Sequence, residues 1–429
     1  MTGPRILIVT YNWPPRNAIG THRPYAWAKY WSNAGAQVTV LTAAKRIFDA
    51  PLDLHLPDLN GVRVIEVPYG GAGLSLLDQL VRNLKVRSYL KRVRSYLRRS
   101  SSSAPADPRS GWRGAAIPLI AELAKDNDFV VSTYGPDASH LIANDAKSAN
   151  PDIIWVADYR DLWSQNPMAG WSDGVRASIR SLEEGSVGRN ADLVTAVSED
   201  MIRQLGEFCK GRLLLAPNGF DLDMEDLEQV FASPSRHCAN PLRIVHTGTV
   251  YPPHGPTPLL EVLAGMADKG DLELGEVTVD FYGSRVELIV QLMCNPRFRP
   301  FLRTPGHVAR EDAIEIQREA DLLLLLASSA PEGRGVLTGK VFEYISAGRP
   351  IICVGSRPDF EIGQLLRRTG TGIVFDYNEP ACIAQVIRAQ LDGKGSPEWF
   401  APKLEEIGRY TRKKQALALL AELTDDRSR

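Results

Sequence analysis

The stretch Thr338-Gly-Lys-Val-Phe-Glu-Tyr-Ile-Ser-Ala-Gly-Arg-Pro-Ile-Ile-Cys-Val-Gly355 decides the fold of this chain. Residues 340–347 form a pattern compatible with a helix, which Gly348 and Pro350 end. The apolar run at 351–354 is typical of a strand buried on both faces. A helix that leads directly into such a strand is the repeating step of a parallel α/β sheet.

Two charged residues occur inside this predicted helix. Lys340 and Glu343 are three positions apart, so they share one helix face near the helix start, where free amide groups favour anions. A cation for phosphate beside a carboxylate for sugar hydroxyls suits a nucleotide-sugar site. The alternative is an ordinary surface ion pair.

Short apolar runs alternate with helical patterns along the rest of the chain. This alternation predicts the α/β class, with two Rossmann-like domains whose parallel sheets face each other across a cleft. We expect the linker at 232–241, which is polar and contains two prolines. The expected strands are residues 6–10, 38–41, 62–67, 129–132, 153–157, 193–197, 213–216, 243–249, 277–282, 322–326, 351–354 and 372–375.

The composition indicates a globular enzyme in the cytoplasm. The chain has 429 residues, which favours two domains over one, with 44% hydrophobic and 24% charged residues. Its formal net charge of −1 argues against a nucleic-acid partner. The five cysteines are scattered, so we expect reduced thiols. We see neither a signal-peptide pattern nor an apolar run long enough to cross a membrane.

Residues 339–352 (GKVFEYISAGRPII) resemble the donor-binding segment of GT-B glycosyltransferases, in particular the large retaining family four of bacterial polysaccharide, lipopolysaccharide and capsule synthesis. Further resemblances follow in the family's order along nearly the whole chain, at 6–15 with Gly20, 156–163, 195–198, 216–221 and 245–249. The resemblance implies an acceptor domain at 1–231 and a nucleotide-sugar donor domain at 242–401. Residues 402–429 resemble the family's final helix, which packs back on the first domain.

The resemblance also implies a set of donor-binding residues, which are Gly20, Gly248, Thr249, His307, Arg334, Lys340 and Glu343. The glycines and Thr249 would supply loops close to the phosphates, and the cations would neutralise the leaving diphosphate. Glu343 would bind the ribose, and the loop at His307 would read the base. The alternatives are a turn histidine at 307 and a solvated loop charge at 334.

This chain departs from the family pattern in two places. Family relatives often carry an arginine and a lysine shortly after the glycine at 248, whereas residues 250–255 read VYPPHG here. Gly335 stands where the family has the first of its paired glutamates, with Glu332 three residues earlier. These departures put the contact with the donor sugar in question.

The acceptor side is predicted from residues that follow strands. Arg160 and Asp161 come directly after a buried strand, so Arg160 would hold an acceptor phosphate and Asp161 would accept the acceptor proton. His140, at a helix start, is a second catalytic candidate, and Arg23 is expected to contact the acceptor. The alternatives are an Arg160–Asp161 structural turn and a capping or packing histidine. Retaining chemistry in the family needs no protein nucleophile, because the leaving phosphate takes the proton.

We expect no cofactor and no metal. There is no Gly-x-Gly-x-x-Gly after either opening strand and no His-Glu-x-x-His. Residues 333–340 resemble a P-loop but are one residue too long, and Val341 replaces the magnesium-binding hydroxyl. Asp221 and Asp223 fit helix capping better than metal binding.

A basic run at 82–99 contains no acidic residue and has apolar residues at helical spacing. This pattern favours docking on an anionic membrane surface. The alternatives are a solvated helix that packs on the first domain and, with less support, RNA binding. The expected location is therefore the cytoplasm, on the inner face of the cell membrane.

Together these features predict a glycosyltransferase that moves a sugar from a nucleotide-sugar donor to a lipid-linked or saccharide acceptor in cell-envelope glycan biosynthesis. One alternative is glycosylation of a small natural product. Another is a non-catalytic subunit that binds sugar nucleotides, which the missing glutamate and cations suggest.

Overall fold

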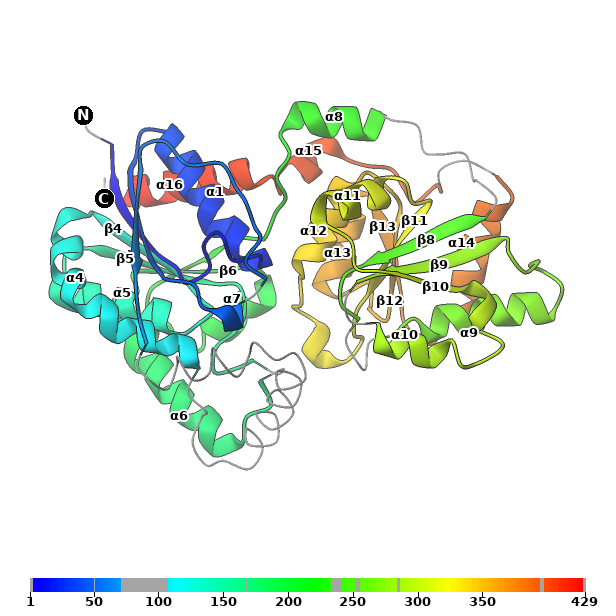
Figure 1. Cartoon of the computed structure of the whole chain (residues 1–429), viewed down its shortest axis with the longest axis horizontal. Helices are drawn as coiled ribbons and strands as arrows, with labels where there is room; N and C mark the ends of the chain where they lie inside the picture. Colours follow the sequence, from blue (N-terminus) through cyan, green and yellow to red (C-terminus); the bar gives the residue numbers. More distant parts are fainter. Residues whose placement is uncertain are drawn as a thin grey trace. The chain divides into compact units, whose positions relative to one another are not determined.

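The computed structural model of the chain describes residues 3–49, 51–70, 107–166, 169–232, 241–250, 255–283, 286–393 and 397–426. The chain forms two compact units (Figure 1). The first contains Met1–Asn218 and Arg412–Arg429, and the second contains Gly219–Thr411. The basic run predicted to bind membranes lies outside the described residues.

The first unit is built on a parallel sheet of seven described strands in the order β3-β2-β1-β4-β5-β6-β7. The order reverses between β1 and β4, which makes this pair the topological switch point of the sheet. The strands are β1 (Arg5–Val9), β2 (Gln37–Ala43), β3 (Val62–Val67), β4 (Phe129–Thr133), β5 (Ile154–Tyr159), β6 (Leu193–Ala196) and β7 (Arg212–Leu215).

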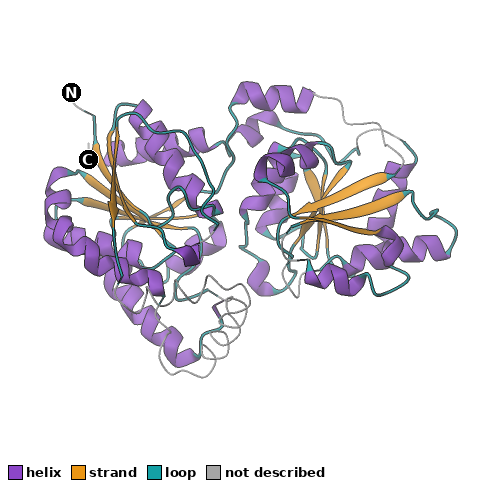
Figure 2. Cartoon of the chain, viewed as in Figure 1, coloured by secondary structure: helices purple, strands orange, loops and turns teal. Residues whose placement is uncertain are grey.

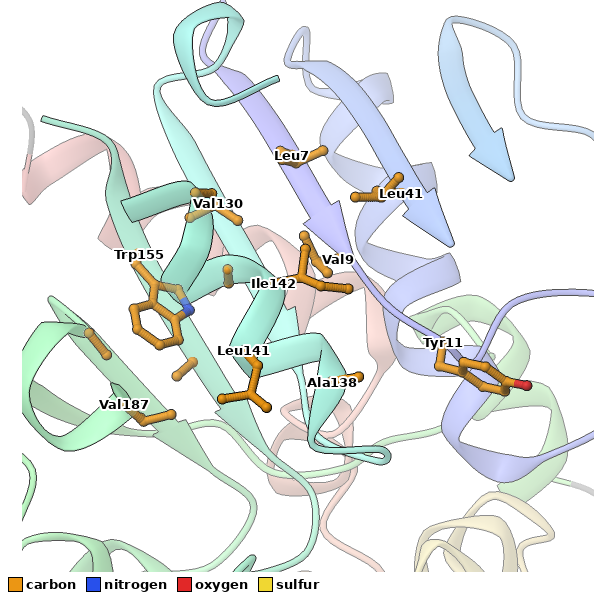
Figure 3. Packing of buried hydrophobic residues seen from close by; sticks show 14 of the residues in the cluster. Leu7, Val9, Tyr11, Leu41, Val130, Ala138, Leu141, Ile142, Trp155 and Val187 are labelled. Atoms are coloured by element: carbon orange, nitrogen blue, oxygen red, sulfur yellow. The ribbon is translucent and has the colours of Figure 1, made fainter. Parts of the chain in front are cut away.

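Helices cover both faces of this sheet (Figure 2). Alternate residues of β1 point to opposite faces: Ile6 packs with Trp31, whereas Leu7 packs with Ile142 and Trp155 (Figure 3). This is why β1 reads as one continuous apolar run. The helices of the unit are α1 (Ile19–Asn33), α4 (Trp112–Asp126), α5 (Ala138–Ala149), α6 (Asp173–Glu183), α7 (Glu199–Leu205) and α16 (Arg412–Asp426).

The second unit has a parallel sheet of six described strands in the order β10-β9-β8-β11-β12-β13. The strands are β8 (Leu242–Thr247), β9 (Val277–Tyr282), β10 (Leu302–Gly306), β11 (Leu322–Leu326), β12 (Ile351–Val354) and β13 (Gly372–Phe375). The helices are α8 (Met224–Ala232), α9 (Thr257–Asp268), α10 (Glu287–Leu292), α11 (Arg310–Arg318), α12 (Gly339–Ser346), α13 (Glu361–Thr369), α14 (Pro380–Leu391) and α15 (Leu404–Gly408). Two sheets of parallel strands flanked by helices confirm the predicted fold class. That the sheets face each other across a cleft stays a prediction.

The division between the units differs from the predicted one. The first unit ends at Asn218 rather than at 231, because α8 belongs to the second unit. Leu227 of α8 is fully buried and packs in one cluster with Phe220 and Phe342. The predicted linker at 232–241 lies mostly outside the described residues.

The end of the chain is shared between the units. Ile407, in α15, is buried in the core of the second unit, whereas α16 lies beside α1 in the first unit (Figure 1). The indole nitrogen of Trp31 donates a hydrogen bond of 2.7 Å to the carbonyl oxygen of Ala416. Over the part of the chain that the structure describes, no helix combines the length and the apolar character needed to cross a membrane.

Candidate functional site

A half-buried cation lies at the carboxyl end of β8, one of the two central strands of the second sheet. Lys340 is the second residue of α12, and its amine lies 3.1 Å from Nε2 of His246, in β8. Nδ1 of His246 lies 2.9 Å from the carbonyl oxygen of Leu324. Because a carbonyl oxygen only accepts, Nδ1 carries the proton, and Nε2 accepts a hydrogen bond from Lys340.

The surroundings of this pair set its charges. Burial, together with the charge of Lys340, lowers the pKa of His246 to about 3, so the imidazole is neutral at physiological pH. Burial lowers the pKa of Lys340 to about 8, and the charge of Glu343 acts in the opposite direction. Lys340 is therefore still mainly charged at neutral pH, but its charge is only partly balanced. An anion beside it would stabilise the ammonium form.

Glu343 is held in place from the neighbouring helix. Gln317, in α11, donates hydrogen bonds to Oε1 of Glu343 at 3.0 Å and to the hydroxyl of Thr247 at 2.9 Å. The hydroxyl of Tyr344 accepts a hydrogen bond from the backbone amide of Thr247 at 2.9 Å. Helices α11 and α12 are thus fastened to the end of β8, which fixes the carboxylate of Glu343 close to Lys340.

Glycine backbone surrounds the amine of Lys340. Gly248 has φ of 105°, and a Cβ atom there would lie 2.8 Å from Nζ of Lys340. A Cβ atom at Gly283 would lie 2.3 Å from the carbonyl oxygen of Gly248. Only residues without side chains allow these strand ends to approach each other and the cation. The predicted loop glycine at 248 is therefore placed beside the predicted cation.

Helix α12 adds the field of its N-terminus. Its N-cap residue, Thr338, makes no side-chain hydrogen bond to the first turn. A helix start without a side-chain cap presents amide groups and a partial positive charge to an anion. With Lys340 in that turn and Glu343 one turn later, the arrangement can bind a phosphate group and a hydroxylated group side by side.

The other predicted donor residues of the second unit differ in their burial and in their partners. Thr249 is half-buried directly after Gly248. His307 is exposed and follows Gly306, at the end of β10. Arg334 is exposed and lies 3.9 Å from Asp359, so its charge already has a partner.

Three residues predicted from the first unit meet at one place, at the carboxyl ends of β4 and β5. Arg160 donates from Nε to the hydroxyl of Thr133 at 3.1 Å and from Nη2 to the carbonyl oxygen of Tyr134. Gly20 lies in the first turn of α1, and a Cβ atom there would lie 1.7 Å from Nη1 of Arg160. The prediction of a flexible loop at Gly20 is wrong, because the glycine is part of a helix and makes room for this guanidinium. Asp161 is exposed beside it.

Arg23 is a correction to the predicted acceptor site. Its guanidinium pairs with Asp158 at 2.6 Å, and both side chains are buried. It also donates to the carbonyl oxygens of Ala216 and Pro217 at 2.8 and 2.7 Å. Asp158 in turn accepts from Thr195 at 2.7 Å. These bonds use most of the N–H groups of Arg23, so its role is to hold the strand ends together.

His140 is a second correction. Its side chain is fully buried, and Nδ1 lies 2.8 Å from the hydroxyl of Ser132. The ring packs against Trp155 and Tyr159, with centroid distances of 6.5 and 4.8 Å. Burial lowers its pKa to about 3. The residue lies on the inner face of α5, so it is a core residue and not an accessible base.

Within the residues that the structure describes, no three His, Cys, Asp or Glu side chains gather closely enough to hold a metal ion. Asp223 accepts a hydrogen bond of 3.0 Å from the amide of Asp226, in the first turn of α8. Asp223 therefore caps this helix.

Solved structures share the whole architecture of this chain. No protein-family profile and no curated sequence matches it. The structure of HepE from Anabaena in complex with UDP matches with a TM-score of 0.61 and 14% identity over 99% of this chain and 100% of HepE. Sucrose-phosphate synthase from Thermosynechococcus elongatus matches with a TM-score of 0.62 and 14% identity, over 99% of this chain and 98% of the synthase. An α,α-trehalose-phosphate synthase (UDP-forming) from Burkholderia xenovorans in complex with glucose-6-phosphate matches with a TM-score of 0.59 and 12% identity, over 98% of this chain and 100% of the synthase.

The chain has the GT-B glycosyltransferase fold.

Three residues of the candidate site were not found from the sequence, although they position the predicted ones. His246 was part of a recognised motif, but nothing in the motif shows that its ring accepts from Lys340. Gln317 and Tyr344 lie in ordinary amphipathic helices. A polar residue at the end of an apolar strand could have indicated His246 as part of the site. No feature of the sequence indicated Gln317.

Proposed function

We propose that this chain is a glycosyltransferase that takes a sugar from a nucleotide-sugar donor, bound at Lys340 and Glu343 of the second unit. The observation that carries the proposal is the half-buried side chain of Lys340, whose amine lies 3.1 Å from a neutral imidazole and beside the glycine backbone at 248. A cation that is only partly balanced, next to a helix N-terminus, is a suitable partner for a diphosphate. The UDP bound to the HepE structure of the same fold supports this ligand class.

The chemistry follows from the charges. The bond between the sugar C1 and the diphosphate oxygen breaks, and a bond from C1 to an acceptor oxygen forms. Negative charge develops on the diphosphate, where Lys340 and the first turn of α12 stabilise it. The acceptor proton passes to the leaving diphosphate, so no protein nucleophile is needed. This route gives retention at C1 and needs no metal.

Glu343 has a separate role in this proposal. Gln317 fixes the carboxylate of Glu343 by a hydrogen bond, and Glu343 lies about one helical turn after Lys340 on the same face of α12. A carboxylate at that distance from a phosphate site can accept hydrogen bonds from the two ribose hydroxyls. Lys340 therefore acts mainly on the diphosphate, and Glu343 acts mainly on nucleotide affinity.

We further propose a lipid-linked or saccharide acceptor and a role in cell-envelope glycan biosynthesis, on the inner face of the cell membrane. The sequence resemblance to the polysaccharide branch supports this pathway. The glucose-6-phosphate bound to the trehalose-phosphate synthase supports a saccharide acceptor. Arg160 remains the candidate for contact with the acceptor, because Nη1 makes no hydrogen bond to the residues that the structure describes.

Calorimetric titration with UDP, GDP and ADP tests the donor site. We expect one nucleotide to bind, and both Lys340→Ala and Glu343→Ala to weaken its binding by about 1.5–3 kcal/mol, the range for a lost hydrogen bond to a charged group. The exposed Lys269, in the same unit, supplies a matched control as Lys269→Ala. Unchanged affinity in both site variants, with their folds intact, would refute the assignment.

A non-catalytic nucleotide-sugar-binding subunit is the second candidate. Gly335, at the position of the family's first glutamate, favours it. The two candidates differ in turnover: a transferase releases nucleoside diphosphate from its donor, whereas a binding subunit releases none.

A further inference from the structure

We propose that Glu183, the last residue of α6, is a positioning residue that holds the segment 160–164 after β5, and through it the guanidinium of Arg160. The inference rests on the proposed function, since Arg160 is the candidate for contact with the acceptor. Glu183 is fully buried, so it acts through this segment and not on a substrate directly.

Helix α6 holds the backbone of Ser164 on both sides. Oε2 of Glu183 accepts a hydrogen bond of 3.0 Å from the amide of Ser164. Nη1 of Arg176 donates a hydrogen bond of 2.8 Å to the carbonyl oxygen of the same residue. Glu183 and Arg176 are seven positions apart, so they share one face of the helix. One acceptor and one donor on α6 therefore fasten the segment at Ser164.

The fastened segment packs against the residue that holds Arg160. The ring of Trp163, next to Ser164, lies 6.0 Å from the ring of Tyr134, measured between centroids. Tyr134 also stacks on Tyr159, the last residue of β5, with centroids 6.0 Å apart. The carbonyl oxygen of Tyr134 accepts a hydrogen bond from Nη2 of Arg160. A shift of Ser164 would therefore move Trp163 and Tyr134, and with them the acceptor of this bond.

The surroundings of Glu183 balance its charge poorly. Oε1 of Glu183 is buried and has no hydrogen-bond partner among the residues that the structure describes. Arg180, a cation that acts on Glu183, pairs instead with Glu184 at 2.5 Å and with Glu207 at 3.9 Å. An ionised carboxylate in this place is therefore costly.

Burial raises the pKa of Glu183, whereas the adjacent Ser164 and Tyr159 act in the opposite direction. The hydroxyls of both residues lie beside the carboxyl group, but neither makes a full hydrogen bond in this structure. A π-helical turn, Glu184–Gly188, follows Glu183 directly, and such turns occur mostly at functional sites. A residue that costs stability and holds a segment at the sheet edge is typical of a functional position.

Hydrogen exchange of the full chain, measured by mass spectrometry, tests the hold on the segment. In Glu183→Ala, peptides that cover 160–166 should exchange about tenfold faster or more, as for a lost hydrogen bond to a charged group. Glu183→Gln keeps an acceptor for the amide of Ser164 and should restore slow exchange. Glu184→Gln removes the same charge at the next, exposed position and should exchange as the wild type does.

Equal exchange of these peptides in the wild type and Glu183→Ala would overturn the inference. Fast exchange in Glu183→Gln would overturn it too, because the amide would keep its acceptor. If Glu183→Ala does not fold, Arg176→Met decides by the same peptides, since it removes the bond to the carbonyl oxygen of Ser164.

Urea titrations at several pH values distinguish a costly carboxyl group from a residue that only packs. The folded state keeps the proton of Glu183 at pH values at which the unfolded state has lost it, so the wild type loses stability as the pH rises through this range. The difference between the urea midpoints should therefore widen in favour of Glu183→Gln from about pH 4.5 to 7. A constant difference would contradict the inference.

The groups around Glu183 do not titrate in this range. Burial raises the pKa of Tyr134 and of Tyr159, and it raises the pKa of Cys209 to about 12. The remaining charged group that acts on Glu183 is Arg180, which stays protonated. A change between pH 4.5 and 7 that differs between the wild type and Glu183→Gln therefore reports Glu183.

Two calorimetric titrations connect the segment to the acceptor and separate this inference from the proposed function. Glucose 6-phosphate is the probe of the acceptor side. We expect Glu183→Ala and Arg160→Gln to weaken its binding by about tenfold or more, and Glu183→Gln to bind it as the wild type does. No binding to the wild type, or equal affinity in the wild type and Glu183→Ala, would overturn the positioning role.

UDP affinity should be equal in the wild type, Glu183→Ala and Glu183→Gln, because the donor site belongs to the other unit. Loss of UDP binding in all three proteins would overturn the proposed function and leave the exchange result intact. UDP binding that falls only in Glu183→Ala would show a general loss of structure and would overturn the positioning role.

Discussion

Replacement of Gly248 by alanine tests the geometry around the amine of Lys340. The residue has φ of 105°, which costs an L-amino acid roughly 1–2 kcal/mol. The new methyl group would lie 2.8 Å from Nζ of Lys340, closer than side-chain contacts allow. Because the amine is the end of a flexible side chain, it moves and loses its 3.1 Å hydrogen bond to His246. That loss contributes about 1.5–3 kcal/mol, as for a hydrogen bond to a charged group.

Gly270→Ala is the matched control. Gly270 lies in the same unit with φ of 73°, and a Cβ atom there has no neighbour within 4 Å. Both variants therefore carry backbone strain, but only Gly248→Ala displaces Lys340. We expect Gly270→Ala to lose about 1–2 kcal/mol and Gly248→Ala about 2.5–5 kcal/mol of unfolding free energy.

The assay combines urea unfolding with calorimetric titration of the nucleoside diphosphate. Gly248→Ala should bind the nucleotide at least about tenfold more weakly than the wild type, since the lost interaction involves a charge. Gly270→Ala should bind it as the wild type does. Equal stability and equal affinity in the two variants would refute the idea that Gly248 makes room for the amine of Lys340.

Three further predictions concern titration and buried charge. The affinity for nucleoside diphosphate should be constant from pH 7 to about 8 and fall by up to about tenfold per pH unit above 8, because Lys340 loses its proton there. Lys340→Arg should remove this fall in affinity. A fall that persists in Lys340→Arg would contradict the assignment of Lys340 to the diphosphate. His140 and His246 both have a pKa lowered to about 3, so the folded state binds fewer protons than the unfolded state between pH 6.5 and 3. Urea titrations should therefore show stability that is complete above pH 6.5 and falls on acidification, by roughly 4 kcal/mol per histidine at pH 3, and a flat profile would contradict this. Arg23→Met should destabilise the first unit by about 3–5 kcal/mol, because Asp158 is left buried without its cation, while nucleotide affinity stays unchanged.

The strands of the fold were largely predictable, since buried parallel strands read as apolar runs. Leu322–Leu326 and Ile351–Val354 are examples, and both lie in the middle of the second sheet. Leu302–Gly306 was not predicted. It is an edge strand with alternating exposure that contains Pro305, and such a strand has little apolar signal.

The candidate site was predictable only where local chemistry shows in the sequence. Lys340 and Glu343 stand out because charges are unexpected at the start of a largely buried helix. The role of Gly20 could not be predicted, because a glycine is needed there to make room for Arg160, which lies far along the chain. His140 was misplaced because a position after a strand end does not show whether the side chain points into the core.

The release of nucleoside diphosphate from nucleotide-sugars tests whether Lys340 stabilises the leaving diphosphate. Wild type, Lys340→Ala and Lys269→Ala would be incubated with UDP-, GDP- and ADP-sugars in the presence of a chelator. We expect release from at least one donor by the wild type and the control, no release by Lys340→Ala, and no dependence on divalent metal. No release from any donor by the wild type, or equal release by Lys340→Ala, would contradict it.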